Sequence, residues 1–250
     1  MPSVSLWVPE SDYDRDAVSC IAQKIVEYYK CENLNIKCVG KATYNDVARK
    51  PDGLQKAVNT YLKKDQLVIF LLDSDGIQSQ AQRQKEPNSL INRIQEVVNS
   101  SGGRVKLIFM VQELEAWLLV DCLGICCYFT KNDKTRQENK WISFTRGIQL
   151  GQTDLIAEAE SGGKGAKEYL VKISKEILIK KNPNLKDKHE NLKKLKYDEN
   201  ESHEIAKFIE ISHQTITRNQ SLAEFAKTLK EVGIAHPTIN LEDDKGTGIF

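Results

Sequence analysis

Short apolar runs alternate with segments of helical apolar spacing through the first 120 or so residues of the chain. Continuous apolar runs are typical of strands buried on both faces of a sheet, and helical spacing predicts amphipathic helices. The predicted strands are residues 3–8, 35–40, 66–72 and 104–111. The predicted helices are residues 16–29, 53–64, 89–99 and 115–123. This alternation predicts an α/β fold, with a mostly parallel central sheet and helices on both of its faces.

The pattern changes after about residue 123. Residues 128–139 are polar and predict a loop, and the lysine-rich stretch before Tyr197 has only weak apolar spacing. Helical spacing returns at residues 163–180, 202–211 and 221–232. We therefore expect an α/β domain at 1–123, a helical, Lys-rich C-terminal region at 124–240 and a flexible tail at 241–250.

Composition narrows the class of protein. Of 250 residues, 40% are hydrophobic and 28% are charged, which is enough apolar material for a folded core. No apolar run approaches the eighteen or so residues of a membrane span, and the first residues lack the pattern of a signal peptide. The six cysteines form no CxxC pair, so reduced thiols are expected. These features predict a cytoplasmic protein without a membrane partner.

Acidic side chains follow three of the four predicted strands. Glu10 follows the first strand, Asp73 and Asp75 follow the third, and Glu113 and Glu115 follow the fourth. The carboxyl ends of parallel strands meet at one edge of a sheet, where ligands usually bind. Carboxylates gathered there repel each other, and a hard divalent cation such as Mg²⁺ or Mn²⁺ removes that repulsion. Any one of these acids could serve a turn or a helix start instead, but together they predict a metal site.

Motifs for other chemistries are incomplete. The segment 73–76 begins like a calcium loop, but its glycine comes too early. The glycines at 162–165 lack the spacing of a phosphate-binding loop, and no GxSxG or HExxH motif occurs.

The acids at these positions resemble the TOPRIM catalytic domain, which occurs in topoisomerases, primases and the overcoming-lysogenization-defect nucleases. Residues 111–119 (VQELEAWLL) are similar to the signature of an uncharacterised TOPRIM-like family, often encoded beside ATPases in bacterial antiphage loci. Residues 164–170, 204–209 and 218–225 resemble weaker helical motifs of that family. The resemblance covers about residues 1–232 and implies a TOPRIM/Rossmann-like sheet.

The resemblance also implies roles for the acids. Glu10 would be the TOPRIM glutamate, acting as general base or second metal ligand, and Asp73 and Asp75 would hold Mg²⁺ at the scissile phosphate. Glu113 and Glu115 would be additions near the same metal. The segment 9–14 (PESDYD) is bulkier and more acidic than the usual first motif, so either Glu10 or Asp14 could be the functional acid. The implied function is a metal-dependent nuclease of antiphage defence that acts with an ATPase partner.

The lysine-rich segment offers a surface for nucleic acid. Eleven lysines and four acids lie between residues 164 and 196, a local excess of about +7. Such an excess can hold a nucleic-acid backbone, or it can be a solvated helical face, because only one aromatic residue, Tyr169, lies among these lysines. The candidate nucleic-acid-binding residues are Lys164, Lys167, Lys193, Lys194 and Arg218. The sequence leaves open DNA or RNA as the substrate, and whether the chain forms a homo-oligomer.

Two other functions remain open. Residues 69–75 (IFLLDSD) resemble the first motif of haloacid-dehalogenase-type phosphatases, although Ile77 stands where that motif has Thr or Val. The chain could also be a non-catalytic, partner-binding subunit whose acidic site is silent.

Overall fold

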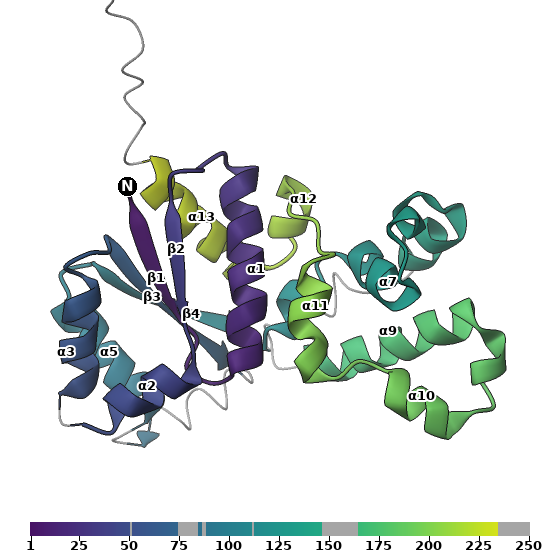
Figure 1. Cartoon of the computed structure of the whole chain (residues 1–250), viewed down its shortest axis with the longest axis horizontal. Helices are drawn as coiled ribbons and strands as arrows, with labels where there is room; N and C mark the ends of the chain where they lie inside the picture. Colours follow the sequence, from purple (N-terminus) through teal and green to yellow (C-terminus); the bar gives the residue numbers. More distant parts are fainter. Residues whose placement is uncertain (51, 75–84, 87–88, 112, 147–164, 235–250) are drawn as a thin grey trace, which may run out of the picture.

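The strands form a single parallel sheet in the order β2-β1-β3-β4 (Figure 1). The computed structural model describes residues 1–50, 52–74, 85–86, 89–111, 113–146 and 165–234. The strand bounds are β1 Ser3–Trp7, β2 Asn35–Val39, β3 Leu67–Ser74 and β4 Val105–Val111. The predicted α/β fold with a parallel sheet is confirmed, and β1 and β3, which precede Glu10 and include Asp73, are direct neighbours.

Helices cover both faces of the sheet, and further helices form a region beside it (Figure 1). The helices within the described residues include α1 (Asp12–Tyr28), α2 (Lys41–Ala48), α3 (Gly53–Tyr61), α5 (Leu90–Ser100), α6 (Glu115–Leu118), α7 (Cys122–Thr130), α9 (Ala166–Lys181), α10 (His189–Leu195), α11 (Ser202–Ala206), α12 (His213–Ile216) and α13 (Gln220–Ile234).

Strand β3 supplies side chains to two separate cores. Its odd-numbered residues from Leu67 to Leu71 join the core under α1 and α13, and its even-numbered residues from Val68 to Leu72 join the core under α2, α3 and α5. This two-residue alternation is the geometry of an extended strand covered on both faces. It explains why residues 67–72 are apolar throughout.

The last helix, α13, packs against the sheet at β4 and against α1. Its residues Phe225 and Leu229 are buried in the same core as the β1 residues Val4 and Leu6. The Phe225 ring stacks on Trp117 with 5.1 Å between centroids. The expected C-terminal region at 124–240 includes this helix, and the structure places it against β4 and α1 of the α/β domain. Apolar spacing shows that a helix is amphipathic but not which surface it covers.

Local structure differs from the sequence-based expectation in three other places. The predicted helix at 115–123 ends at Leu118, and Asp121 starts α7 by accepting a hydrogen bond from the Gly124 N–H. Residues 128–139, predicted as a loop, contain the end of α7 and the 3₁₀ helix η1 (Asp133–Gln137). Helix α10 forms within the lysine-rich stretch, where a single leucine, Leu192, is buried. Capping and tertiary packing outweigh weak spacing in such short elements.

The helical region is fastened to α1 by specific contacts. Lys24 donates hydrogen bonds to the backbone oxygens of Lys207 and Ile209 at 2.6 and 2.7 Å. Among the described residues, no helix is long and apolar enough to cross a membrane.

Candidate acidic site at the carboxyl end of the sheet

The carboxyl ends of β1 and β3 bring Glu10 and Asp73 into contact. The backbone N–H of Asp73 donates a hydrogen bond to Glu10 Oε2 at 2.5 Å. Asp73 continues the odd-numbered side of β3 and therefore lies on the face of the sheet that α1 covers. The register that pairs β1 with β3 places these two residues together although they are 63 positions apart.

Asp73 is an electrostatically unfavourable carboxylate. Its Oδ1 atom is buried and has no hydrogen-bond partner among the described residues. Burial raises the pKa of Asp73 well above its usual range, and the nearby charges of Asp14, Glu10, Glu115 and Glu113 raise it further. A buried acid without a donor and surrounded by like charge favours its neutral form or a bound cation.

Asp14 reaches the site from the first turn of α1. The helix begins at Ser11, whose Oγ accepts hydrogen bonds from the N–H groups of Tyr13 and Asp14 at 3.1 and 3.3 Å. Burial raises the pKa of Asp14 to about 6, Glu115 contributes to that rise, and Lys167 opposes it. Asp14 and Glu10 therefore both belong to the acidic site, and the structure keeps both as candidates for the functional acid.

Glu113 and Glu115 enter the site from the turn after β4. Glu113 has a φ of +70°, a left-handed conformation that turns the chain sharply after the strand. Glu115, at the start of α6, is only 5% exposed. The charges of both carboxylates raise the pKa of Asp73.

Glu115 is held by a residue from the C-terminal region. The Tyr197 hydroxyl donates to Glu115 Oε1 at 2.6 Å and lies 2.7 Å from Ser202 Oγ. The Tyr197 N–H donates to Ser174 Oγ of α9 at 2.9 Å. Burial and the charge of Glu115 raise the pKa of Tyr197, so the hydroxyl remains a donor. Tyr197 lies 82 residues from Glu115, and no motif in the sequence indicates this pairing.

The acids are neighbours, but the described side chains do not form a finished metal centre. Within the described ranges, no group of three or more His, Cys, Asp or Glu side chains is arranged to hold a metal ion. Asp75, the second aspartate of the predicted pair, lies outside the described residues. The site that is described is an acidic cluster around an unpartnered Asp73 oxygen.

The predicted nucleic-acid-binding residues have different surroundings. Lys167 forms an ion pair with Glu199 and lowers the pKa of Asp14, so it lies beside the acidic site. Lys193 is exposed and pairs with Glu190 at 3.1 Å. Lys194 lines a groove in the helical region. Arg218 donates to the Val120 carbonyl at 2.5 Å, a contact that links α12 to the segment before α7. Lys164 lies outside the described residues.

The acidic site thus draws on three parts of the fold: the carboxyl ends of the strands, the first turn of α1 and the helical region that holds Glu115. Comparison of the chain with protein-family models, with curated proteins and with solved structures finds no match.

Proposed function

We propose that the protein hydrolyses phosphodiester bonds of nucleic acid with Mg²⁺ or Mn²⁺ bound at the acidic site. The observation that carries this proposal is the Asp73 Oδ1 atom, which is buried without a hydrogen-bond partner among the described residues. The carboxylates of Glu10, Asp14, Glu113 and Glu115 all raise the pKa of Asp73. A cation offsets both the missing donor and the repulsion.

The chemistry of the side chains fits a hard divalent cation. Carboxylate oxygens are the ligands that Mg²⁺ and Mn²⁺ prefer. Asp73 would hold the ion together with Asp75, and Glu10, Glu113 and Glu115 would complete or orient the ligand set. The ion, when bound, supplies a positive charge that polarises the scissile phosphate and makes a water molecule more acidic.

The residues around Asp73 have separable tasks in this proposal. Glu10 fixes the backbone of Asp73 through the N–H···O contact of 2.5 Å. Asp14, whose pKa is raised to about 6, can take up a proton near neutral pH, which is the requirement for a general base. Lys167 places a positive charge beside these acids, where the backbone of a polyanionic substrate has to approach.

The resemblance of Glu10, Asp73 and Asp75 to the TOPRIM domain supports the same reaction class. It also supports a role in antiphage defence with an ATPase partner, which stays a prediction. The proposed chemistry acts on the phosphodiester group that DNA and RNA share, so both are substrates to be tested.

Substitution of Asp73 by Asn tests the proposal. The parent protein should cleave DNA or RNA with Mg²⁺ or Mn²⁺ and not with EDTA. Asp73→Asn should lower kcat at least about 100-fold, because loss of an outer partner alone costs 10- to 100-fold at metal sites. The same substitution should abolish Mn²⁺ binding in calorimetry. It should not lower the melting temperature, because it removes a charge that its neighbours repel.

Asp46→Asn is the matched control, since Asp46 is an exposed aspartate on α2, a helix that packs on the other face of the sheet from Asp73. Equal cleavage and equal Mn²⁺ affinity in Asp73→Asn and the parent would overturn the proposal. Hydrolysis of p-nitrophenyl phosphate but not of nucleic acid, lost in Asp73→Asn, would assign the haloacid-dehalogenase-type phosphatase instead. A parent protein that binds no Mn²⁺ and cleaves neither substrate would favour a non-catalytic, partner-bound subunit.

A further inference from the structure

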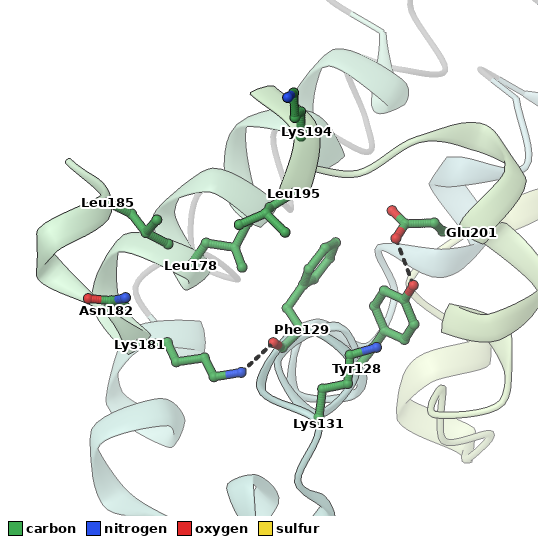
Figure 2. A pocket seen from close by; sticks show the side chains of 10 residues that line it. All are labelled: Tyr128, Phe129, Lys131, Leu178, Lys181, Asn182, Leu185, Lys194, Leu195 and Glu201. Atoms are coloured by element: carbon green, nitrogen blue, oxygen red, sulfur yellow. Dashed lines mark hydrogen bonds between the residues drawn. The ribbon is translucent and has the colours of Figure 1, made fainter. Parts of the chain in front are cut away.

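A groove of about 320 Å³ lies in the helical region between α7, the C-terminal end of α9 and α10 (Figure 2). It is separate from the acidic site, and its lining shares no residue with the acids around Asp73. Its volume is at the lower end of the range of small-ligand pockets.

The groove has an apolar floor. Phe129 of α7 and Leu178 of α9 are 6% and 7% exposed and form its base. Leu195, at the end of α10, is 48% exposed, and Leu185 lies on the α9–α10 side (Figure 2). An exposed leucine beside two buried apolar side chains is a surface that a flat apolar group can cover.

The rim of the groove is positively charged. The lining lysines are Lys131, Lys181 and Lys194, all exposed. Glu201, the one acid among the described lining residues, accepts a hydrogen bond from the Tyr128 hydroxyl at 2.8 Å. Lys181 donates to the Phe129 carbonyl at 3.2 Å, which uses one of the three protons of its ammonium group. Lysines on both sides of an apolar floor favour a ligand that combines a flat apolar body with negative charge.

We propose that this groove binds an unpaired nucleotide of single-stranded nucleic acid, a proposal that rests on nucleic acid being the substrate of the acidic site. The base would lie on the apolar floor, the Asn182 side-chain amide would face its polar edge, and the lysines would hold the flanking phosphates. A duplex does not fit this arrangement, because its bases are stacked inside the helix and cannot reach an apolar floor.

Helix α9 connects the two sites. Lys167, in its first turn, lies beside Asp14, and Lys181, its last residue, lines the groove. Its 16 residues span about 24 Å. A strand held in the groove would therefore place neighbouring phosphates toward the acidic site, and the groove would determine which substrates reach it.

The test measures binding without cleavage. The full-length protein is titrated, in EDTA, into a fluorescently labelled 20-nucleotide single strand, and affinity is followed by anisotropy at several salt concentrations. The triple variant Lys131→Gln, Lys181→Gln, Lys194→Gln should bind at least about tenfold more weakly. For this variant, the slope of log K against log salt concentration should be smaller in magnitude by about 2, because three phosphate contacts are lost and each contributes about 0.7 to the slope.

A charge-matched variant controls for general attraction. Three exposed lysines lie on or next to α2 and α3, which cover the face of the sheet opposite to α1: Lys41, Lys56 and Lys63. The triple variant Lys41→Gln, Lys56→Gln, Lys63→Gln should bind within twofold of the parent. Leu195→Ser should weaken binding about fivefold without changing the salt slope, because it removes apolar contact and no charge.

Each remaining outcome decides the proposal. Equal losses in the two lysine triples, tighter binding of a duplex than of the single strand, or displacement of the strand by micromolar AMP would overturn it. Failure of the acidic-site proposal is distinguishable, because cleavage retained by Asp73→Asn leaves the binding measurement in EDTA untouched. Conversely, if the triple variant at Lys131, Lys181 and Lys194 binds the single strand as tightly as the parent, the groove proposal fails, and the metal-dependent cleavage that tests the acidic site is unaffected.

Discussion

Two aspartates at opposite ends of the β3 segment have opposite environments. Asp65, just before the strand, is 2% exposed and accepts hydrogen bonds from Ser3 Oγ and Ser5 Oγ at 2.6 Å and from Lys37 Nζ at 3.1 Å. Burial alone would raise the pKa of Asp65, but the bonds from Ser3, Ser5 and Lys37 outweigh it and lower the pKa.

Asp73, at the other end, has a buried Oδ1 without a partner among the described residues and has carboxylates around it. Both residues are aspartates of one chain segment, and the structure treats one as a satisfied anion and the other as an unsatisfied one. The comparison shows that burial by itself does not mark a functional acid. The missing partners do, because a fold without a ligand gains nothing from an unpaired buried charge.

The largest effect on stability is expected at Asp65. Asp65→Ala removes the acceptor of the Ser5 hydroxyl and of the Lys37 ammonium group. The Ser3 hydroxyl loses the same acceptor and keeps its bond to the Lys64 carbonyl. It should lower the free energy of unfolding by about 3 kcal/mol, the low end for a broken buried pair because Lys37 is partly exposed. Urea denaturation measures this loss. The comparison fails if Asp73→Asn destabilises the protein as much as Asp65→Ala does.

A smaller effect is expected from the hydrogen bond between Tyr197 of the helical region and Glu115 of the acidic site. Tyr197→Phe removes the hydroxyl that donates to Glu115 and should cost about 1–3 kcal/mol of stability. It should also weaken Mn²⁺ binding about tenfold, because Glu115 loses the group that orients it. Calorimetry measures the affinity.

Ser174→Ala is the control for this prediction. It removes the acceptor of the Tyr197 N–H and leaves the hydroxyl bond to Glu115 in place. We expect it to lower stability and to keep the Mn²⁺ affinity of the parent. If both variants lose the same affinity, Tyr197 supports the fold and does not position Glu115.

The smallest effect is a pH dependence of opposite sign at the two kinds of acid. The pKa of Asp14 is raised from 3.8 to about 6, so the folded state binds more protons than the unfolded state between these values. Stability from this group therefore falls as pH rises from about 4 to 6, by about 1 kcal/mol given its partial exposure. The lowered pKa of Asp65 acts the other way, and its contribution is lost only as pH falls below the usual range of an aspartate.

Melting temperatures between pH 4.5 and 7 check this sign. Asp14→Asn should reduce the fall in melting temperature above pH 5. Saturating Mn²⁺ should have the same effect on the parent protein, because a cation offsets the repulsion between the carboxylates. A decline that persists unchanged in Asp14→Asn would show that another group causes it.

The pattern of apolar and polar residues predicts most strands of the sheet and part of the acidic site. The apolar runs at β3 and β4 predict buried strands, and the acids after them predict a common edge because parallel strands end together. Glu10 and Asp73 meet as this reasoning expects. The sequence offers Asp14 only as an alternative to Glu10, because a residue at the start of a helix cannot be placed against a sheet until the direction of the helix is known.

Other parts of the site have no local signal. Phe129, on the floor of the groove, lies in a stretch that the sequence predicts as a loop, and two of the lining lysines, Lys181 and Lys194, come from α9 and α10. The lysine-rich segment 164–196 contains one aromatic residue, Tyr169. The aromatic side chains that line the groove, Tyr128 and Phe129, meet the lysines only after α7 packs beside α9.

The sequence by itself determined the period of each element: alternation of two residues makes a strand with two apolar faces, and spacing of 3.6 makes a helix with one. It therefore determined the α/β layer and the acids at the ends of its strands. Only the tertiary structure decided that α13 covers the sheet, that Tyr197 holds Glu115, and that Asp65 is satisfied where Asp73 is not. These contacts join residues tens of positions apart, and their energy depends on the path of the whole chain and not on any local pattern.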